Sequence, residues 1–190
     1  QPTAGDVKYA DLNNDGIMDE RDKKVVSPYS NTPEIMFGLN LSASWKGFDF
    51  SALFQGAANR NVMLSGFATQ MFINGASNLP KYLYEDHWTP DNRDACYPKA
   101  WGPDHPSNNK SSTFWLINGN YVRLKNVELG YSISKDLLSR VGVDRLRIYV
   151  GGSNLFSIDH MPGYDPEKQD GGPNYYPQQR VFNMGVNITF

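Results

Sequence analysis

Six residues near the amino end have the spacing of a calcium-binding loop. They occupy positions one, three, five, seven, nine and twelve of one short stretch, and they are Asp11, Asn13, Asp15, Ile17, Asp19 and Asp22. Ca²⁺ takes hard oxygen ligands, which side chains supply at five of these positions and the carbonyl group of Ile17 supplies at the sixth. Gly16 allows the sharp turn inside such a loop. The spacing therefore predicts a calcium site that stiffens a loop and takes no part in a reaction.

The motif departs from the EF-hand pattern at its last position, where Asp22 stands in place of Glu. The shorter side chain would reach the ion differently, as in dockerin-like loops. Both flanks look like loops, so a helix–loop–helix sensor is not expected. The alternative interpretation is a solvated acidic turn that binds no ion.

A second group of candidate binding residues is aromatic and lies between residues 59 and 118, a stretch without sustained periodicity. Its members are Tyr82, Tyr84, His87, Trp88, Tyr97, Trp101, Phe114 and Trp115. A connection this long is usually functional or disordered. Aromatic faces can stack on sugar rings or fill a partner's groove, and the alternative is packing of the loop on itself. Trp88 and Trp101 are the residues that we expect to face a substrate.

The remaining chemistry-bearing residues form no catalytic pattern. His87, His105 and His160 lack the spacing of a metal cluster, and Cys96 has no Cys/His context. Neither paired carboxylates nor a phosphate-binding glycine loop stands out. The formal net charge of −2 and the mixed charge pattern leave no footprint for nucleic acid. We therefore expect neither an enzyme nor a nucleic-acid-binding protein.

The elements that would hold these loops alternate apolar and polar residues with the period of a β-strand. Strands are expected at 35–45, 48–55, 120–133, 146–151 and 182–190. Lys46 and Gly47 join the first two strands in a hairpin. The third strand keeps one apolar face only if a β-bulge lies near Lys125 and Asn126. Residues 134–144 are expected to form a short turn or helix.

The strands have the features of a membrane barrel wall. Their polar faces are small and mostly uncharged, as expected for a large barrel whose apolar faces meet lipid. The connections alternate between short ones, at 46–47 and 134–144, and long ones, at 59–118 and 157–179. Outer-membrane barrels have short periplasmic turns and long extracellular loops in this order. We therefore predict an all-β chain, with about five antiparallel strands of a large transmembrane β-barrel.

The order and spacing of several motifs resemble the SusC/RagA-type TonB-dependent transporters of Bacteroidota. The matching stretches are 5–9, 11–16, 48–56, 87–92, 121–131, 146–150, 154–156, 163–167 and the terminal Phe190. The resemblance implies the C-terminal part of a barrel of about 22 strands, whose plug and other strands lie outside this chain. Residues 1–32 would be an extracellular loop with the calcium motif, and residues 33–190 the last strands of the barrel.

The resemblance also implies a function. It is TonB-dependent import of glycan oligomers or peptides across the outer membrane, in complex with a SusD-like surface lipoprotein. TonB would be reached through the missing N-terminal parts, and the strands would contact outer-membrane lipid. The alternative is a soluble extracellular calcium-stabilised β module that binds carbohydrate. A secreted β-rich hydrolase is a further rival, against which the lack of a catalytic constellation argues.

Overall fold

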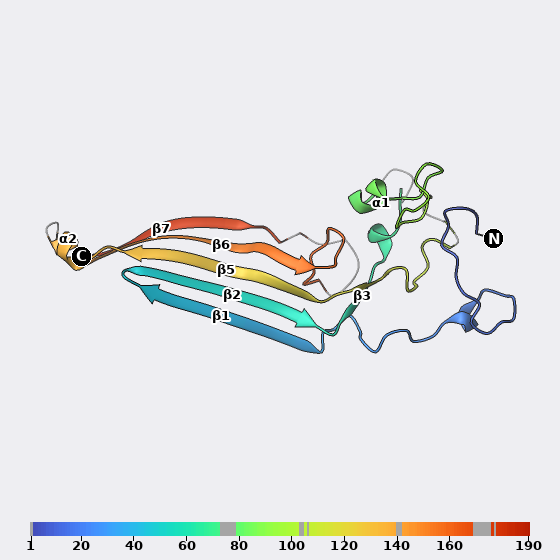
Figure 1. Cartoon of the computed structure of the whole chain (residues 1–190), viewed down its shortest axis with the longest axis horizontal. Coiled ribbons are helices and arrows are strands. Elements are labelled where there is room, and N and C mark those ends of the chain that lie inside the picture. Colours follow the sequence, from blue (N-terminus) through green and yellow to red (C-terminus); the bar gives the residue numbers. More distant parts are fainter. Residues whose placement is uncertain are drawn as a thin grey trace.

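The chain forms one five-stranded antiparallel sheet. The computed structural model describes residues 2–72, 79–102, 105, 107–139, 142–168, 176 and 178–190. Within these residues the sheet has the order β1-β2-β5-β6-β7, so the strands lie side by side in the order of the chain (Figure 1). Their bounds are β1 (Ile35–Trp45), β2 (Phe48–Ala58), β5 (Tyr121–Ser132), β6 (Arg145–Asp159) and β7 (Val181–Thr189). The predicted all-β architecture is confirmed.

The register of the strands gathers the apolar residues on one face of the sheet. Leu41 pairs with Ala52, and Ala52 pairs with Val127; farther along, Val127 pairs with Gly152 and Gly152 with Phe182. Residues directly opposite each other share a face. Large apolar side chains of this face are exposed in every strand: Phe37, Leu39, Phe50, Leu129, Ile148, Val150, Phe182, Met184, Val186 and Ile188. A face of this size needs a cover that the described residues do not provide.

The β-bulge expected in the third long strand is confirmed. In the pairing of β5 with β2, Phe54 pairs with Leu124 and Leu53 with Asn126, so Lys125 is an extra residue without a partner. The extra residue keeps the apolar residues before and after it on the same face. It also allows Lys125 to leave the ladder and reach an acidic segment beyond β6, described below.

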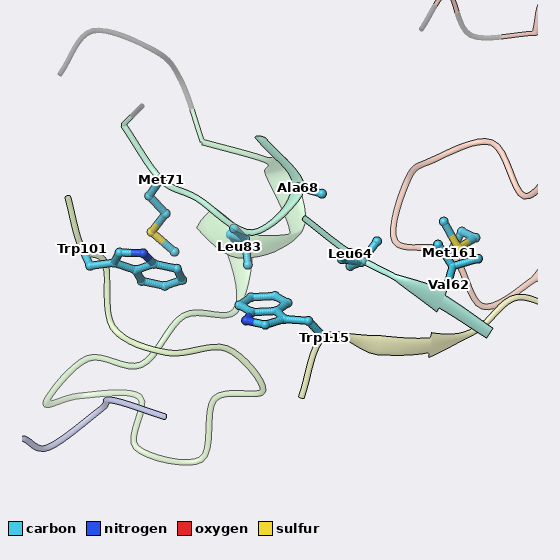
Figure 2. Packing of buried hydrophobic residues seen from close by; sticks show 8 residues of the cluster. All are labelled: Val62, Leu64, Ala68, Met71, Leu83, Trp101, Trp115 and Met161. Atoms are coloured by element: carbon cyan, nitrogen blue, oxygen red, sulfur yellow. The ribbon is translucent and has the colours of Figure 1, made fainter. Parts of the chain in front are cut away.

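The long connection between β2 and β5 has a hydrophobic core of its own. It contains the short paired strands β3 (Asn61–Met63) and β4 (Leu116–Asn118), the 3₁₀ turn η2 (Gly66–Ala68) and the helix α1 (Lys81–Glu85). We call its described residues between 61 and 118 the loop module. Its core comprises Val62, Leu64, Ala68, Met71, Leu83, Trp101 and Trp115, with Met161 from the β6–β7 connection (Figure 2). The sequence did not predict these short elements, because they are too short to show a period, but packing of the loop on itself was the alternative given for its aromatic residues.

Both long connections lie at one end of the sheet, together with the amino-terminal segment (Figure 1). The β1–β2 turn and the short helix α2 (Lys135–Leu138) lie at the other end. The expected alternation of long and short connections is therefore seen in space. Two strands are longer than expected: β2 continues from 55 to Ala58, and β6 continues from 151 to Asp159, past the start of the loop expected at 157. Pairing of Asp159 with Tyr121 extends β6. None of the helices in the described ranges is long and apolar enough to cross a membrane.

Candidate functional site

The calcium-type loop, residues 11–22, is held together by backbone amides that donate to its side chains. Gly16 donates to Oδ2 of Asp11 over 2.8 Å, and Asp15 donates to Oδ1 of Asn13 over 2.9 Å. Ile17 in turn donates to Oδ1 of Asp15 over 2.8 Å. Nδ2 of Asn13 also donates to Oδ2 of Asp15 over 3.0 Å, whereas Oδ1 of Asp11 has no hydrogen-bond partner. The side chains of the first half of the loop are therefore bonded to one another and to the backbone.

Asp22 closes the second half of this loop. Its Oδ1 accepts from the backbone amide of Leu12 over 2.8 Å, and its Oδ2 accepts from that of Asp19 over 2.9 Å. Hydrogen bonds from these two amides, Asp19 first, lower the pKa of Asp22. The turn between the halves uses left-handed backbone at Asn14 (φ 60°) and Gly16 (φ 79°). The shorter Asp22 side chain therefore closes the loop, because it links the backbone near its start, at Leu12, to the backbone near its end, at Asp19.

The side chains of this loop offer the hard oxygen atoms that Ca²⁺ takes, but they are not gathered around one point. Oδ1 of Asp11 is buried and has no hydrogen-bond partner. The guanidinium of Arg21 lies 2.8 Å from both Asp15 and Asp19, so a side-chain cation neutralises the fifth and ninth positions. Within the described ranges, no group of three or more His, Cys, Asp or Glu side chains is gathered into a metal centre. Calcium would therefore have to displace Arg21 and draw the carboxylates together, and whether it binds stays a prediction.

Asp6 ties the segment before this loop to the loop module. Its carboxylate is 4% exposed and lies 3.2 Å from both Nζ of Lys99 and Nε2 of His105. It also accepts from Thr3, through the backbone amide and the hydroxyl, and from the side-chain amide of Asn108. Burial by itself raises the pKa of Asp6, but the hydrogen bonds from Thr3, Lys99 and Asn108 outweigh it and lower the pKa to about 2. The carboxylate is thus held in its charged form.

Backbone contacts strengthen this attachment. The carbonyl of Gly5 accepts from the amide of Lys99 over 2.8 Å, and the amide of Val7 donates to Oδ1 of Asn108 over 2.8 Å. Gly5 has φ 83°, and a Cβ there would lie 2.5 Å from the ring of Trp88. Only glycine fits this close approach. The segment that precedes the calcium-type loop is therefore attached to the loop module by these contacts.

The two tryptophans expected to face a substrate lie in different surroundings. Trp88 is half-buried and lines an open pocket of about 400 Å³ beside Lys8, Tyr97 and Phe114. Trp101 is 4% exposed in the core of the loop module, the packing role that was the alternative for these aromatics. A substrate-facing role is therefore carried forward for Trp88 alone, and it stays a prediction.

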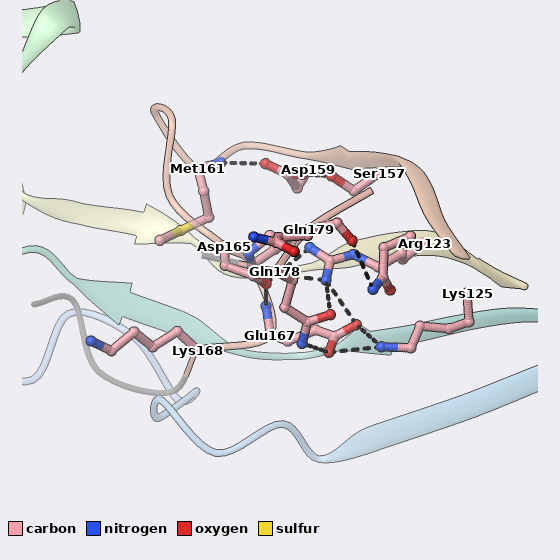
Figure 3. A network of polar contacts seen from close by, with 12 residues as sticks. Arg123, Lys125, Ser157, Asp159, Met161, Asp165, Glu167, Lys168, Gln178 and Gln179 are labelled. Carbon is pink, nitrogen blue, oxygen red and sulfur yellow. Dashed lines mark hydrogen bonds and ion pairs between the residues drawn. The ribbon is translucent and has the colours of Figure 1, made fainter. Parts of the chain in front are cut away.

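A charged cluster on the polar face of the sheet was not recognised as a site in the sequence (Figure 3). Arg123 of β5 lies 2.9 Å from Asp165 and 3.2 Å from Glu167, and Lys125 lies 2.9 Å from Glu167. In both segments the two charged residues are spaced two apart. That spacing was the available signal, although nothing in the sequence shows that the two segments meet.

Comparisons with known proteins give consistent relatives, although no family model matches the chain. TonB-dependent receptor P26 of Formosa agariphila is 31% identical over 98% of this chain and 20% of its own length. TonB-dependent receptor SusC of Bacteroides thetaiotaomicron is 24% identical over 96% of this chain and 17% of its own length. Among solved structures, the RagAB peptide transporter covers 85% of this chain and 18% of its own, with 29% identity and a TM-score of 0.62. The RagAB peptide importer in its closed-closed state gives a TM-score of 0.65 at 28% identity, over 86% of this chain and 18% of its own.

The open sheet with its long connections at one end, taken with these relatives, defines a segment of a TonB-dependent receptor. More narrowly, the resemblance to the SusC/RagA type is confirmed, and it agrees with the expected C-terminal barrel segment. The chain spans about a fifth of the length of the curated relatives that it matches. These relatives are receptors and transporters rather than enzymes.

Proposed function

We propose that this chain supplies part of the wall and the external loops of an outer-membrane importer driven by TonB. The observation that carries the proposal is the sheet itself, with one wholly apolar face and with its long connections at one end. Likeness to the RagAB transporter over 85% of the chain supports the same role. The polar face would line the lumen, and the loop module would face the outside of the cell.

The apolar face is matched to outer-membrane lipid. Val150, Met184 and Val186 are all more than half exposed, on strands long enough for a tilted crossing. Aromatic rings gather at the end with the short connections, where Phe48 and Tyr131 have ring centroids 4.6 Å apart. Such rings are typical of the headgroup layer. A soluble β module would leave this face in water, and no observation favours that alternative.

The same arrangement supports a proposal for the cargo and the partner. We propose that the cargo is a glycan oligomer or a peptide, delivered by a SusD-like lipoprotein seated over the loop module. Trp88 would contact the cargo or the partner, because its open pocket also contains Phe114 and Lys8. TonB would act through parts of the receptor outside this chain.

We also propose a structural Ca²⁺ in the loop 11–22, held by Asp11, Asn13, Asp15, Asp19 and Asp22 and by the carbonyl of Ile17. The buried, unpartnered oxygen of Asp11 supports this proposal. The ion would stiffen a loop that is already attached to the loop module through the segment around Asp6. It would supply no chemistry to transport.

The test is to extract outer membranes of the source organism with detergent and to measure the denatured mass of the polypeptide that carries this sequence. The expected mass is several times the 21.4 kDa of this chain, with a surface lipoprotein in the same complex and with glycan or peptide uptake lost when the gene is deleted. A water-soluble polypeptide of 21.4 kDa would overturn the proposal.

A further inference from the structure

The first part of the β6–β7 connection bridges the sheet and the loop module. We call residues 160–168 the strap. Met161 is buried in the core of the loop module, next to Val62 (Figure 2). The ring of Tyr164 packs against the same core, with its centroid 6.0 Å from that of Tyr82. One side of the strap is therefore part of the loop module.

The other side of the strap is bound to the sheet by charge (Figure 3). Asp165 and Arg123 form a two-bond pair, at 2.9 and 3.3 Å, with side chains only 8% and 7% exposed. Glu167 accepts from Lys125 over 2.9 and 3.1 Å. Buried ion pairs with good geometry are costly to break, since separation leaves each charge uncompensated. The strap therefore has a strong, directional attachment to β5.

A third cation holds the backbone of the strap. Arg60, just beyond β2, is 2% exposed and donates to the carbonyl of Pro166 over 2.7 Å and to that of Lys168 over 2.6 Å. Within the strap, the amide of Glu167 donates to Oδ1 of Asp165 over 2.9 Å. The turn at residues 165–168 is thus held both by a hydrogen bond within the strap and by bonds to Arg60 and to β5. Moving it would break contacts with two different parts of the wall at once.

We propose that the Arg123–Asp165 and Lys125–Glu167 pairs are positioning groups that lock the strap, and through it the loop module, onto the barrel wall. The loop module is then a fixed platform and does not swing open with the bound partner. The identity of the partner that docks on the loop module rests on the proposed function. The attachment of the strap rests only on the ion pairs of Arg123 and Lys125 and on the hydrogen bonds of Arg60.

The test uses the full receptor in its native outer membrane, with Asp165→Asn and Glu167→Gln combined so that shape is kept and charge is lost. Limited trypsin digestion of whole cells should cleave the loop module at least about tenfold faster than in the wild type, because local opening becomes easier. The folded barrel, seen by its migration in unheated detergent gels, should remain. Asp49→Asn is the matched control, since Asp49 pairs with Arg147 on the same polar face near the short-turn end. It should leave the cleavage rate unchanged.

A second measurement needs no variant. Hydrogen exchange of the wild-type receptor should protect the amide of Glu167 to the same degree as the amides of β5. Fast exchange there, or cleavage of the double variant at the wild-type rate, would overturn the lock.

Retention of the lipoprotein, measured by affinity purification, should fall in the double variant. If even the wild type retains no lipoprotein, the proposed docking function fails, and the trypsin and exchange results still decide on the lock.

Discussion

The Arg21 guanidinium would compete with Ca²⁺ for two carboxylates of the calcium-type loop. Its guanidinium neutralises Asp15 and Asp19, two of the carboxylates that an ion would need. Arg21→Ala should therefore raise the calcium affinity of the receptor, by roughly two- to tenfold because exposed ion pairs are individually weak. Isothermal titration with Ca²⁺ on the detergent-extracted receptor measures the change.

Lys23→Ala is the matched control for this prediction, since Lys23 pairs with Glu20 outside the ligand set. It should leave the affinity unchanged, and Asp11→Asn should abolish binding. Absence of binding in the wild type and in Arg21→Ala alike would establish the acidic-turn interpretation in place of the calcium site.

Asp6 predicts an acid-sensitive attachment. Its pKa is about 2 in the folded chain and 3.8 without the fold, so it binds fewer protons when folded. The stabilisation is therefore fully present above about pH 4 and is lost as the pH falls towards 2. Pepsin digestion of the loop module should accelerate over this interval, and Asp6→Asn should remove much of that dependence. Glu85→Gln, which only alters a pair with Lys81 inside α1, should keep the wild-type profile; equal profiles for all three would contradict the assignment.

At the scale of elements, neighbouring residues of one strand should differ sharply in their tolerance of charge. Leu41 lies on the apolar face of β1 and Ser42 on the polar face, at nearly the same depth. Leu41→Arg should destabilise the receptor by about 2–4 kcal/mol, because a charge at mid-membrane depth is poorly solvated. Ser42→Arg should be tolerated. Heat-modifiable gel migration and the amount of assembled receptor report the difference, and equal tolerance would argue against a lipid-facing surface.

The sequence predicted the long strands well because each carries enough residues to show a period of two. Even the bulge at Lys125 could be inferred, since the alternation of β5 changes phase there. The same reasoning could not find β3 or β4, which are three residues each. These strands exist because Val62 and Trp115 pack in a common core, and that packing depends on contacts between distant residues.

Candidate site residues could be predicted only where the pattern is local. The spacing from Asp11 to Asp22 lies within one loop, and the structure shows that loop with its side chains bonded internally. By contrast, Arg123 and Asp165 are 42 positions apart, and their pairing depends on the path of the chain. Trp88 and Trp101 cannot be told apart in the sequence. Only the fold shows that Trp88 lines a pocket and that Trp101 is buried in the core of the loop module.

At the scale of the whole molecule, the chain should not be stable by itself in water. Within the described residues, the outer edges of β1 and β7 pair with no further strand, and the face between them is apolar. Open edges are excluded from lipid and promote aggregation in water. The 190-residue chain expressed alone should therefore form aggregates, which sedimentation velocity detects, while the full receptor in detergent sediments as a discrete species. A monomeric, folded 21.4 kDa chain in detergent-free buffer would mean that the apolar face needs no lipid, and the importer would have to be abandoned for the soluble β module.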